Sequence, residues 1–217
     1  MNVLIIGATG PTGQKLVQQA LAQGHEVTVL VRNPDKFEQP DDSTEGTASL
    51  PLHVLKGDVL DPDSLQTAMS GQQAVVSSLG SKLSRKPITL LSEGTKNLIQ
   101  AMQQQGVRRL VCITGLGAGD SKGHGGFIYD RLILPLLLKE IYKDKDRQEA
   151  VVRDSSLDWT IVRPAPFHNG AATGNYRVFT DLINVTASKI SRADTAAFVL
   201  KQLSDDLYLH QTPLISE

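Results

Sequence analysis

Three glycines spaced three residues apart could bring the main chain close to a phosphate group. Gly7, Gly10 and Gly13 lie in the sequence GATGPTG, which follows a short apolar run and leads into a helical pattern. In that context the first glycine permits a tight turn, the second lets amides approach a pyrophosphate, and the third lets helix and strand pack closely. A helix that begins at Pro11 also offers free N–H groups to phosphates. A merely structural glycine-rich turn is the alternative, but the position between strand and helix favours a dinucleotide site.

The residue after the second apolar run indicates which dinucleotide is bound. In NAD-binding proteins an acidic residue about 20 positions beyond the glycine loop bonds the ribose 2′-hydroxyl. Arg32 occupies that place here. A guanidinium cannot accept a hydrogen bond, but it can donate two to a 2′-phosphate, and Lys36 could add a second cation. We therefore expect NADP(H), although without the glycine loop both residues would be interpreted as solvated loop residues.

Short apolar runs alternate with amphipathic ones along the chain, which is typical of βαβ units and a parallel sheet. The apolar runs predict strands at residues 3–6, 26–31, 52–56, 74–77, 109–113 and 157–163. The amphipathic runs predict helices at residues 11–22, 62–69 and 88–104. Each of these helices is followed by a glycine that suits a left-handed end, at positions 24, 71 and 106.

Beyond Arg163 the alternation gives way to shorter pieces. An extended piece at 176–179, a helix near 192–203 and an extended segment around 209–215 are expected. We predict one Rossmann-like α/β domain over residues 1–217, a doubly wound parallel sheet in which 164–217 form a small substrate-side extension and not an independent domain.

Three stretches depart from the regular pattern. Residues 33–50 predict a polar loop, and the five glycines that precede Gly126 in residues 115–126 predict a flexible connection that could form a movable rim. Residues 127–154 have a helical pattern that Pro135 should kink or split. Within this pattern Glu149 is expected on a solvated helix face with other charged residues.

Composition excludes several classes of function. The chain has 217 residues, with 22 Lys and Arg against 23 Asp and Glu, so its formal charge is −1 and nucleic acid is not an expected partner. Cys112 is the only cysteine and is expected in the core, and the histidines lack ligand spacing, so no disulfide or metal site is expected.

Hydropathy gives an expectation about location. The longest apolar run, Leu132 to Leu138, is interrupted by Pro135 and is far shorter than the roughly 20 residues that span a bilayer. With no export leader at Met1, we expect a soluble cytoplasmic protein without a membrane partner, present as a monomer or a weak homo-oligomer.

Several motifs together resemble those of the atypical short-chain dehydrogenase/reductase group, specifically NAD(P)H-binding proteins related to flavin reductase (the B-type biliverdin reductase) and to NmrA-like regulators. The resemblance covers nearly the full length of the chain. It rests on GATGPTG (7–13), VTVLVRNPDKF (27–37), GDVLDPDSL (57–65), SSLGSK (77–82), SEGTKNLIQAM (92–102), LDWTIVRPAPF (157–167) and SRADTA (191–196).

The resemblance implies a set of cofactor-binding residues. Thr9, Gly10, Pro11 and Thr12 would line the pyrophosphate, and Arg32 with Lys36 the 2′-phosphate. Asp58 and Val59 would lie at the adenine, although Asp58 could equally be a simple turn or cap residue. Beside the ribose it places Ser78, Leu79 and Gly80. The segments expected to border the nicotinamide are Thr114 with Gly115, and Pro164, Pro166 and Phe167.

The usual catalytic pair of short-chain dehydrogenases is missing. That pair is a Tyr with a Lys four residues later. Tyr142 is followed at four by Asp146, and Lys145 stands at three, which does not match the spacing. The remaining candidates are the Thr114 hydroxyl and the His168 imidazole, although a strand-end hydrogen bond and an exposed loop position are the plainer interpretations.

Two functions from different classes follow from the resemblance. The first is an NADPH-dependent oxidoreductase that passes hydride to a flavin or a similar planar acceptor, such as a linear tetrapyrrole, where positioning is the protein's main task. The alternative is a non-catalytic NADP(H)-binding redox sensor of the NmrA-like type, which the missing Tyr–Lys pair would suit.

Overall fold

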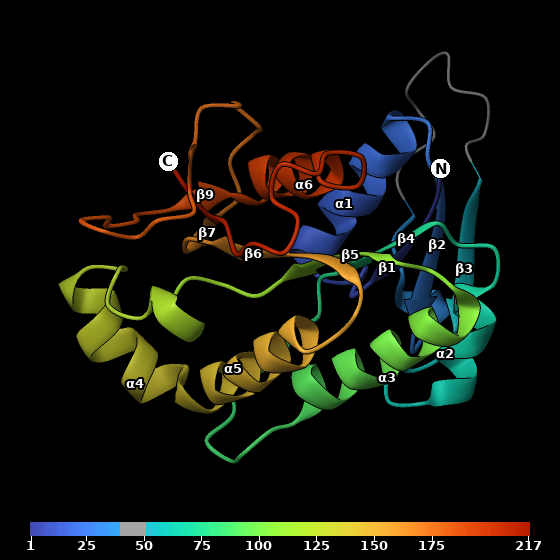
Figure 1. Cartoon of the computed structure of the whole chain (residues 1–217), viewed down its shortest axis with the longest axis horizontal. Helices are drawn as coiled ribbons and strands as arrows, with labels where there is room; N and C mark the ends of the chain where they lie inside the picture. The colour runs from blue at the N-terminus through green and yellow to red at the C-terminus, as the bar shows by residue number, and fades with distance from the viewer. Residues whose placement is uncertain (40–50) are drawn as a thin grey trace.

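The computed structural model describes residues 1–39 and 51–217, and it is built around one eight-stranded sheet (Figure 1). The strand order is β3-β2-β1-β4-β5-β6-β10-β8, and neighbours are parallel except at the β10–β8 edge. A separate short parallel pair joins β7 to β9. The strands are β1 (Asn2–Ile6), β2 (Glu26–Val31), β3 (Leu52–Lys56), β4 (Ala74–Ser77), β5 (Arg109–Ile113), β6 (Asp158–Pro164), β7 (Phe167–His168), β8 (Arg177–Phe179), β9 (Ile190–Ser191) and β10 (Leu214–Ser216).

Helices cover both faces of the sheet. In Figure 1, α1 (Pro11–Ala22) and α6 (Arg192–Lys201) lie above it, whereas α2 (Pro62–Met69), α3 (Leu90–Gln105) and α5 (Lys139–Arg153) lie below. Alternate strand residues therefore enter different cores: Val3 and Ile5 pack with α1, and Leu4 and Ile6 pack with α2 and α3. Because both faces are buried, the strands are apolar throughout, as the sequence indicated.

The predicted doubly wound sheet with a C-terminal extension is confirmed. All six predicted parallel strands are present, and β1 lies between β2 and β4. The strand order therefore reverses at the boundary between the neighbouring strands β1 and β4. Open α/β sheets bind ligands at such a boundary. Gly24, Gly71 and Gly106 have φ of 79°, 75° and 71°, as their positions after helices required.

The helical segment around Pro135 is divided, as predicted. A π-helical turn covers Tyr129–Ile133, the short α4 covers Leu134–Leu137, and α5 begins at Lys139. The π-helical turn continues into α4 through Ile133 and Leu134, which both have right-handed helical φ and ψ, so Pro135 lies inside this helical run and has no N–H to donate to the preceding turn. The division thus comes at Leu138, just after the proline.

Two irregular segments differ from expectation or are only partly described. Leu116, Ala118 and Ser121 are buried, so the first half of the glycine-rich connection is part of the packed core and not a flexible rim. Of the polar loop predicted at 33–50, the structure describes a short 3₁₀ turn at Pro34–Lys36, and residues 40–50 lie outside the described residues.

Candidate functional site

A cleft of about 500 Å³ lies at the carboxyl ends of β1 to β5. Each of these five strands ends immediately before a residue that lines the cleft, so the parallel sheet gathers residues that are distant in sequence. The lining residues are Ile6, Gly7, Thr9, Gly10, Pro11, Thr12, Leu30, Val31, Arg32, Gly57, Asp58, Val59, Ser78, Leu79, Gly80, Ser81, Leu90, Ile113, Thr114, Lys145, Phe167 and Arg192.

The glycine loop at one end of the cleft is tightly packed. Gly7 has a φ of 82°, and a Cβ there would lie 2.6 Å from the carbonyl carbon of Ser78. A Cβ on Gly13 would lie 2.7 Å from Cα of Ala8 and overlap the Gly7 carbonyl, so α1 packs closely on the loop. Gly10 is less confined, since its Cβ would meet only the Gly7 oxygen at 3.4 Å. Gly7 and Gly13 thus match the tight turn and the close helix packing expected of the motif, although Gly13 itself does not line the cleft.

The N-terminus of α1 opens into the same cleft. Gly10 is its N-cap and supplies no side-chain hydrogen bond, and the first turn contains no acidic residue. The N–H groups of this turn, together with the helix dipole, therefore present positive potential to the cleft. This arrangement suits a phosphate group.

Two arginines belong to the lining of the cleft. Arg32 follows β2 directly and lines the cleft with an exposed side chain. Lys36 is exposed on the 3₁₀ turn and is not a lining residue. Arg192, which the sequence argument did not select although it lies in the motif SRADTA, lies with its guanidinium 4.9 Å from the ring centre of Phe167. Stacked in this way, Arg192 and Phe167 form one wall.

The predicted adenine and ribose residues also line the cleft. Asp58 accepts a hydrogen bond from the Leu60 amide through Oδ1 at 2.9 Å, so it is a turn residue as well as a lining residue. Val59 is buried against Gly94 of α3. The stretch after β4, Ser78 to Gly80, lines the cleft as a group.

Lys145 of α5 is the titratable group that the spacing argument missed. Its ammonium group lines the cleft and donates a hydrogen bond to the main-chain oxygen of Thr114. Burial lowers the pKa of Lys145 to about 8, although the negative charge of Glu149 nearby acts in the opposite direction. Lys145 therefore loses its proton at a lower pH than an ordinary lysine does.

Tyr142, one turn before Lys145, does not reach the cleft. Its hydroxyl lies 2.8 Å from the Tyr129 hydroxyl. The Tyr129 hydroxyl in turn donates a hydrogen bond to the main-chain oxygen of Leu116 at 2.9 Å. Tyr142 is thus the donor in the pair, and burial raises its pKa well above the ordinary value. A Cβ on Gly115 would lie 2.9 Å from the Tyr142 oxygen and 3.0 Å from the Lys145 nitrogen. Gly115 therefore provides space for both groups but does not line the cleft.

A buried ion pair supports Thr114 from behind. The Thr114 hydroxyl donates to Glu149 Oε1 at 2.8 Å, and Arg163 binds the same carboxylate through Nε at 2.9 Å and Nη2 at 2.6 Å. Arg163 also donates to Asp120 at 2.5 Å. Glu149 is 2% exposed, so its expected place on a solvated helix face was wrong. The Thr114 hydroxyl is already committed to this network, which leaves its carbonyl, held by Lys145, at the cleft.

Asp144, next to Lys145, holds the start of α3. Its carboxylate accepts from the Leu91 amide at 2.8 Å and the Ser92 hydroxyl at 2.5 Å. Thr89 is the N-cap of α3 but makes no side-chain cap bond. Asp144 thus caps α3 from another helix, because its carboxylate satisfies an N–H group that would otherwise lack a partner.

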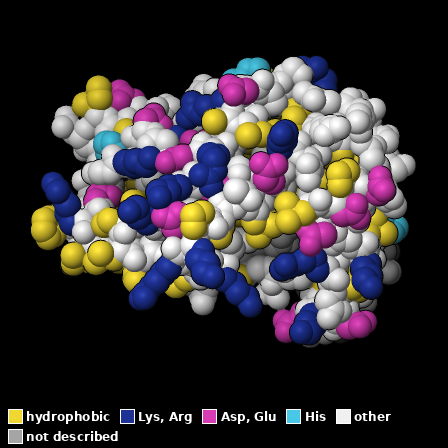
Figure 2. Space-filling model, turned by 90° about the horizontal axis from the view of Figure 1, so that it is seen from below, with side chains coloured by type: hydrophobic (Ala, Val, Ile, Leu, Met, Phe, Trp, Pro, Cys, Tyr) yellow, Lys and Arg dark blue, Asp and Glu magenta, His cyan; other side chains and the backbone are white. Residues whose placement is uncertain are grey.

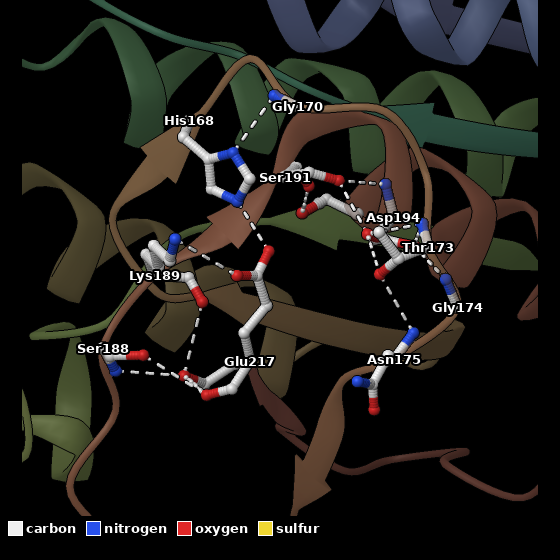
Figure 3. Close-up of polar contacts among 12 residues, drawn as sticks. His168, Gly170, Thr173, Gly174, Asn175, Ser188, Lys189, Ser191, Asp194 and Glu217 are labelled. Atoms are coloured by element: carbon white, nitrogen blue, oxygen red, sulfur yellow. Dashed lines mark hydrogen bonds and ion pairs between the residues drawn. The ribbon is translucent and has the colours of Figure 1, made fainter.

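Three further predicted residues lie beside the cleft and not among its lining residues. Pro164 accepts from the Leu116 amide and Pro166 from the Ile190 amide through their carbonyls. His168 turns toward Glu217, with Nε2 at 2.6 Å from Oε1, while its Nδ1 accepts from the Gly170 amide (Figure 3). The proton-donor role suggested for His168 therefore has no support from its position.

A second cluster in Figure 3 fixes the segment that precedes β8. Ser191 is the N-cap of α6, and its hydroxyl accepts a hydrogen bond from the Asp194 amide. The Asp194 carboxylate accepts hydrogen bonds from the amides of Thr173 and Gly174 at 2.9 and 2.8 Å. Its neighbour Arg192 is held at 2.6 Å from Asn169. The motif SRADTA thus anchors a loop and presents Arg192 to the cleft.

Comparisons with known proteins agree with this geometry. The chain is 28% identical over 214 residues to the uncharacterized protein YwnB of Bacillus subtilis, covering 94% of this chain and 92% of YwnB. It is also 28% identical over 179 residues to the uncharacterized chloroplastic protein At2g34460 of Arabidopsis thaliana, covering 80% of this chain and 62% of that longer protein.

Solved structures share the fold. ChuY, an anaerobillin reductase from Escherichia coli O157:H7, has a TM-score of 0.80 at 22% identity, with coverage of 100% of this chain and 97% of ChuY. A short-chain dehydrogenase/reductase from Veillonella parvula, solved in complex with NADP, has a TM-score of 0.81 at 16% identity, with coverage of 100% and 94%. Residues 7–206 match the model of the NAD(P)H-binding family, and this chain belongs to that family.

Proposed function

We propose that this protein is an NADPH-dependent oxidoreductase that reduces a flavin or a similar planar acceptor, a linear tetrapyrrole included. The observation that carries the proposal is the convergence of the glycine loop, Arg32 and Lys145 on one cleft. An anion-binding helix end, a cation for a 2′-phosphate and a titratable group are the parts such a reaction needs.

The lining of the cleft offers a group for each part of the proposed cofactor. The N-terminus of α1 would hold the pyrophosphate, and Arg32, which follows β2, would bind the 2′-phosphate. A nicotinamide dinucleotide, when bound, supplies the hydride. The chain's own contribution lies at the other end, where Thr114, Lys145 and Phe167 border the space left for an acceptor.

Lys145 is assigned two tasks. Its ammonium group, fixed by the Thr114 carbonyl, has further N–H groups with which to orient ribose hydroxyls. Since its pKa is lowered to about 8, it can also deliver a proton at the acceptor. Lys145 takes this role because Tyr142, the tyrosine nearest to it in α5, is hydrogen-bonded to Tyr129 in a buried pair and does not face the acceptor.

Support for the acceptor class comes from the walls and from similarity. Arg192 stacked on Phe167 presents a flat surface with positive charge, which suits a planar acceptor with acidic substituents. ChuY, which shares the fold, is an anaerobillin reductase. An acceptor of this shape needs positioning against the hydride donor more than covalent help.

The test is an absorbance assay with purified protein, NADPH and one acceptor at a time: FMN, riboflavin or biliverdin. We expect loss of nicotinamide absorbance well above the uncatalysed rate with at least one of them. Tight NADPH binding with no acceptor reduced would instead favour the alternative, a redox sensor of the NmrA-like type.

A further inference from the structure

An apolar surface is exposed at the end of the molecule that carries α4. Phe127 is 77% exposed and Leu136 70%, values that are unusual for large apolar side chains on a protein without a partner there. We call this the α4 surface. It consists of Phe127, Ile128, Leu132, Ile133, Leu136 and Leu137, which are exposed by 37% or more.

The helical geometry places these six side chains together. They occur as three adjacent pairs, beginning at residues 127, 132 and 136, so the pairs repeat every four to five residues. The π-helical turn Tyr129–Ile133 has about one residue more per turn than an α-helix, which matches the longer first interval. Tyr129 lies on the opposite side of the segment, where its hydroxyl donates a hydrogen bond to the main-chain oxygen of Leu116. One side of the segment is thus anchored and the other is apolar and exposed.

Basic residues flank the α4 surface. Arg131 is exposed between two of its pairs, and Lys139 and Lys143 are exposed at the start of α5. The loop 81–88, which enters α3 and contacts α5, carries three further exposed Lys and Arg side chains and no acidic residue: Lys82, Arg85 and Lys86. Arg147 ties the end of this loop to α5 by donating to the Ile88 oxygen at 2.6 Å.

Residues 127–143 contain two acidic side chains, and both are already paired. Asp130 accepts from the Gly125 amide at 3.0 Å, and Glu140 has a side chain only 13% exposed that pairs with Lys143. Figure 2 shows hydrophobic side chains grouped at the left end of the molecule, with Lys and Arg side chains beside them. The chain as a whole has a formal charge of −1, so this end is locally cationic against an almost neutral background.

We propose that the α4 surface docks on an anionic lipid bilayer. The three apolar pairs would enter the boundary between headgroups and acyl chains, and the flanking Lys and Arg would bind lipid phosphates. No described helix is long and apolar enough to cross a membrane, so this contact would be interfacial. The expectation of no membrane partner rested on the length needed to span a bilayer, which docking of this kind does not require.

The charges favour a lipid surface over a second copy of the chain. In a two-fold symmetric dimer the same patch occurs on both sides, so the cations of one copy would face those of the other. Like charges brought together in this way oppose association. Anionic headgroups instead satisfy all of them at once. None of the six residues of the α4 surface lines the cleft.

The test measures co-sedimentation of the full chain with vesicles. One set contains phosphatidylcholine alone, and the other contains equal parts of phosphatidylcholine and phosphatidylglycerol. We expect binding to the anionic vesicles that weakens as salt is added, and at least about tenfold weaker binding to the neutral ones, because several Lys and Arg near the surface contribute.

Two variants test the two parts of the proposed contact. Leu136→Asp with Leu137→Asp should lower the affinity for anionic vesicles at least about tenfold, because it removes two apolar side chains and places two negative charges against the headgroups. Arg85→Gln with Lys86→Gln should lower it about tenfold and reduce the salt dependence. Leu207→Asp is the matched control, because Leu207 is 63% exposed away from this surface and should bind as the parent does.

Each other outcome overturns the proposal. Equal binding by the Leu136→Asp, Leu137→Asp variant would mean that the α4 surface is not the contact. Absence of vesicle binding, together with a dimer in analytical ultracentrifugation that the same variant abolishes, would make the surface a self-association interface. Unchanged NADPH affinity verifies that each variant is folded, and it separates this question from the proposed oxidoreductase function.

Discussion

Arg163 and Glu149 form a two-pronged ion pair in the interior of the protein. Nε meets Oε1 at 2.9 Å and Nη2 meets Oε2 at 2.6 Å, and the two side chains are 1% and 3% exposed. The same carboxylate accepts the Thr114 hydroxyl. The pair therefore connects α5 and β6 directly behind the strand end that borders the cleft.

Removing one member of this pair should be strongly destabilising. Arg163→Met leaves the Glu149 carboxylate buried without its counter-ion, and we expect a loss of about 3–5 kcal/mol in the free energy of unfolding, measured by urea denaturation. Adding Glu149→Leu to this variant should restore part of the loss, because the uncompensated charge is removed with it. A double variant as unstable as the sum of the two single ones would show that the pair is not coupled.

Arg32 should determine the choice between NADPH and NADH. Arg32→Ala removes the cation that follows β2 in the cleft, and we expect NADPH to bind about 1.5–3 kcal/mol more weakly while NADH is nearly unchanged. Calorimetric titration with both dinucleotides measures this difference. Lys36→Ala is the control, because Lys36 is exposed outside the lining and should have a smaller effect. Equal weakening of both dinucleotides by Arg32→Ala would contradict the assignment.

Lys145 should give the reaction its alkaline limit. Its pKa is lowered to about 8 by burial, so the protonated form that donates to the acceptor disappears as the pH rises through that value. We expect kcat to fall above about pH 8 in the parent protein. Lys145→Met should lower kcat by about 10²–10⁴-fold, the usual contribution of a proton donor, and abolish that limb of the profile. A limb that persists in the variant would assign it to another group.

The glycine loop predicts a contrast between two alanine substitutions. A Cβ on Gly13 would lie 2.7 Å from Cα of Ala8, which is main chain and cannot move aside, whereas a Cβ on Gly80 would meet nothing within 4 Å. Gly13→Ala should therefore lower the free energy of unfolding by about 1–3 kcal/mol, and Gly80→Ala should leave it within about 0.5 kcal/mol. Thermal unfolding of the two variants decides this, and similar melting temperatures would refute the packing argument.

Local pattern was enough to predict most of the sheet and its phosphate-binding end. Strands buried on both faces leave continuous apolar runs, and a glycine loop between a strand and a helix is a strong local signal of phosphate binding. These signals depend on neighbours in sequence. The β10–β8 edge was only approximated as extended pieces, since the partners of short strands come from distant parts of the chain.

The chemical end of the site escaped prediction because tertiary packing creates it. Lys145 meets Thr114 across 31 residues, and a rule on Tyr–Lys spacing has no means of detecting that contact. Glu149 lies in a highly charged helix, so its pattern indicated solvent, and only the position of Arg163 on β6 shows why it is buried. Charge alone does not distinguish a surface residue from half of a buried pair.

Asp144 and Lys145 are consecutive in α5 and hold partners on different sides of it. One carboxylate fixes the beginning of α3, and the next side chain fixes the end of β5. Neither a slide of α5 along its axis nor a twist about it can improve one of these contacts without spoiling the other. The position of the ammonium group is thus determined from two directions at once, and redesign of the α3 start would shift the end of the cleft that Lys145 lines.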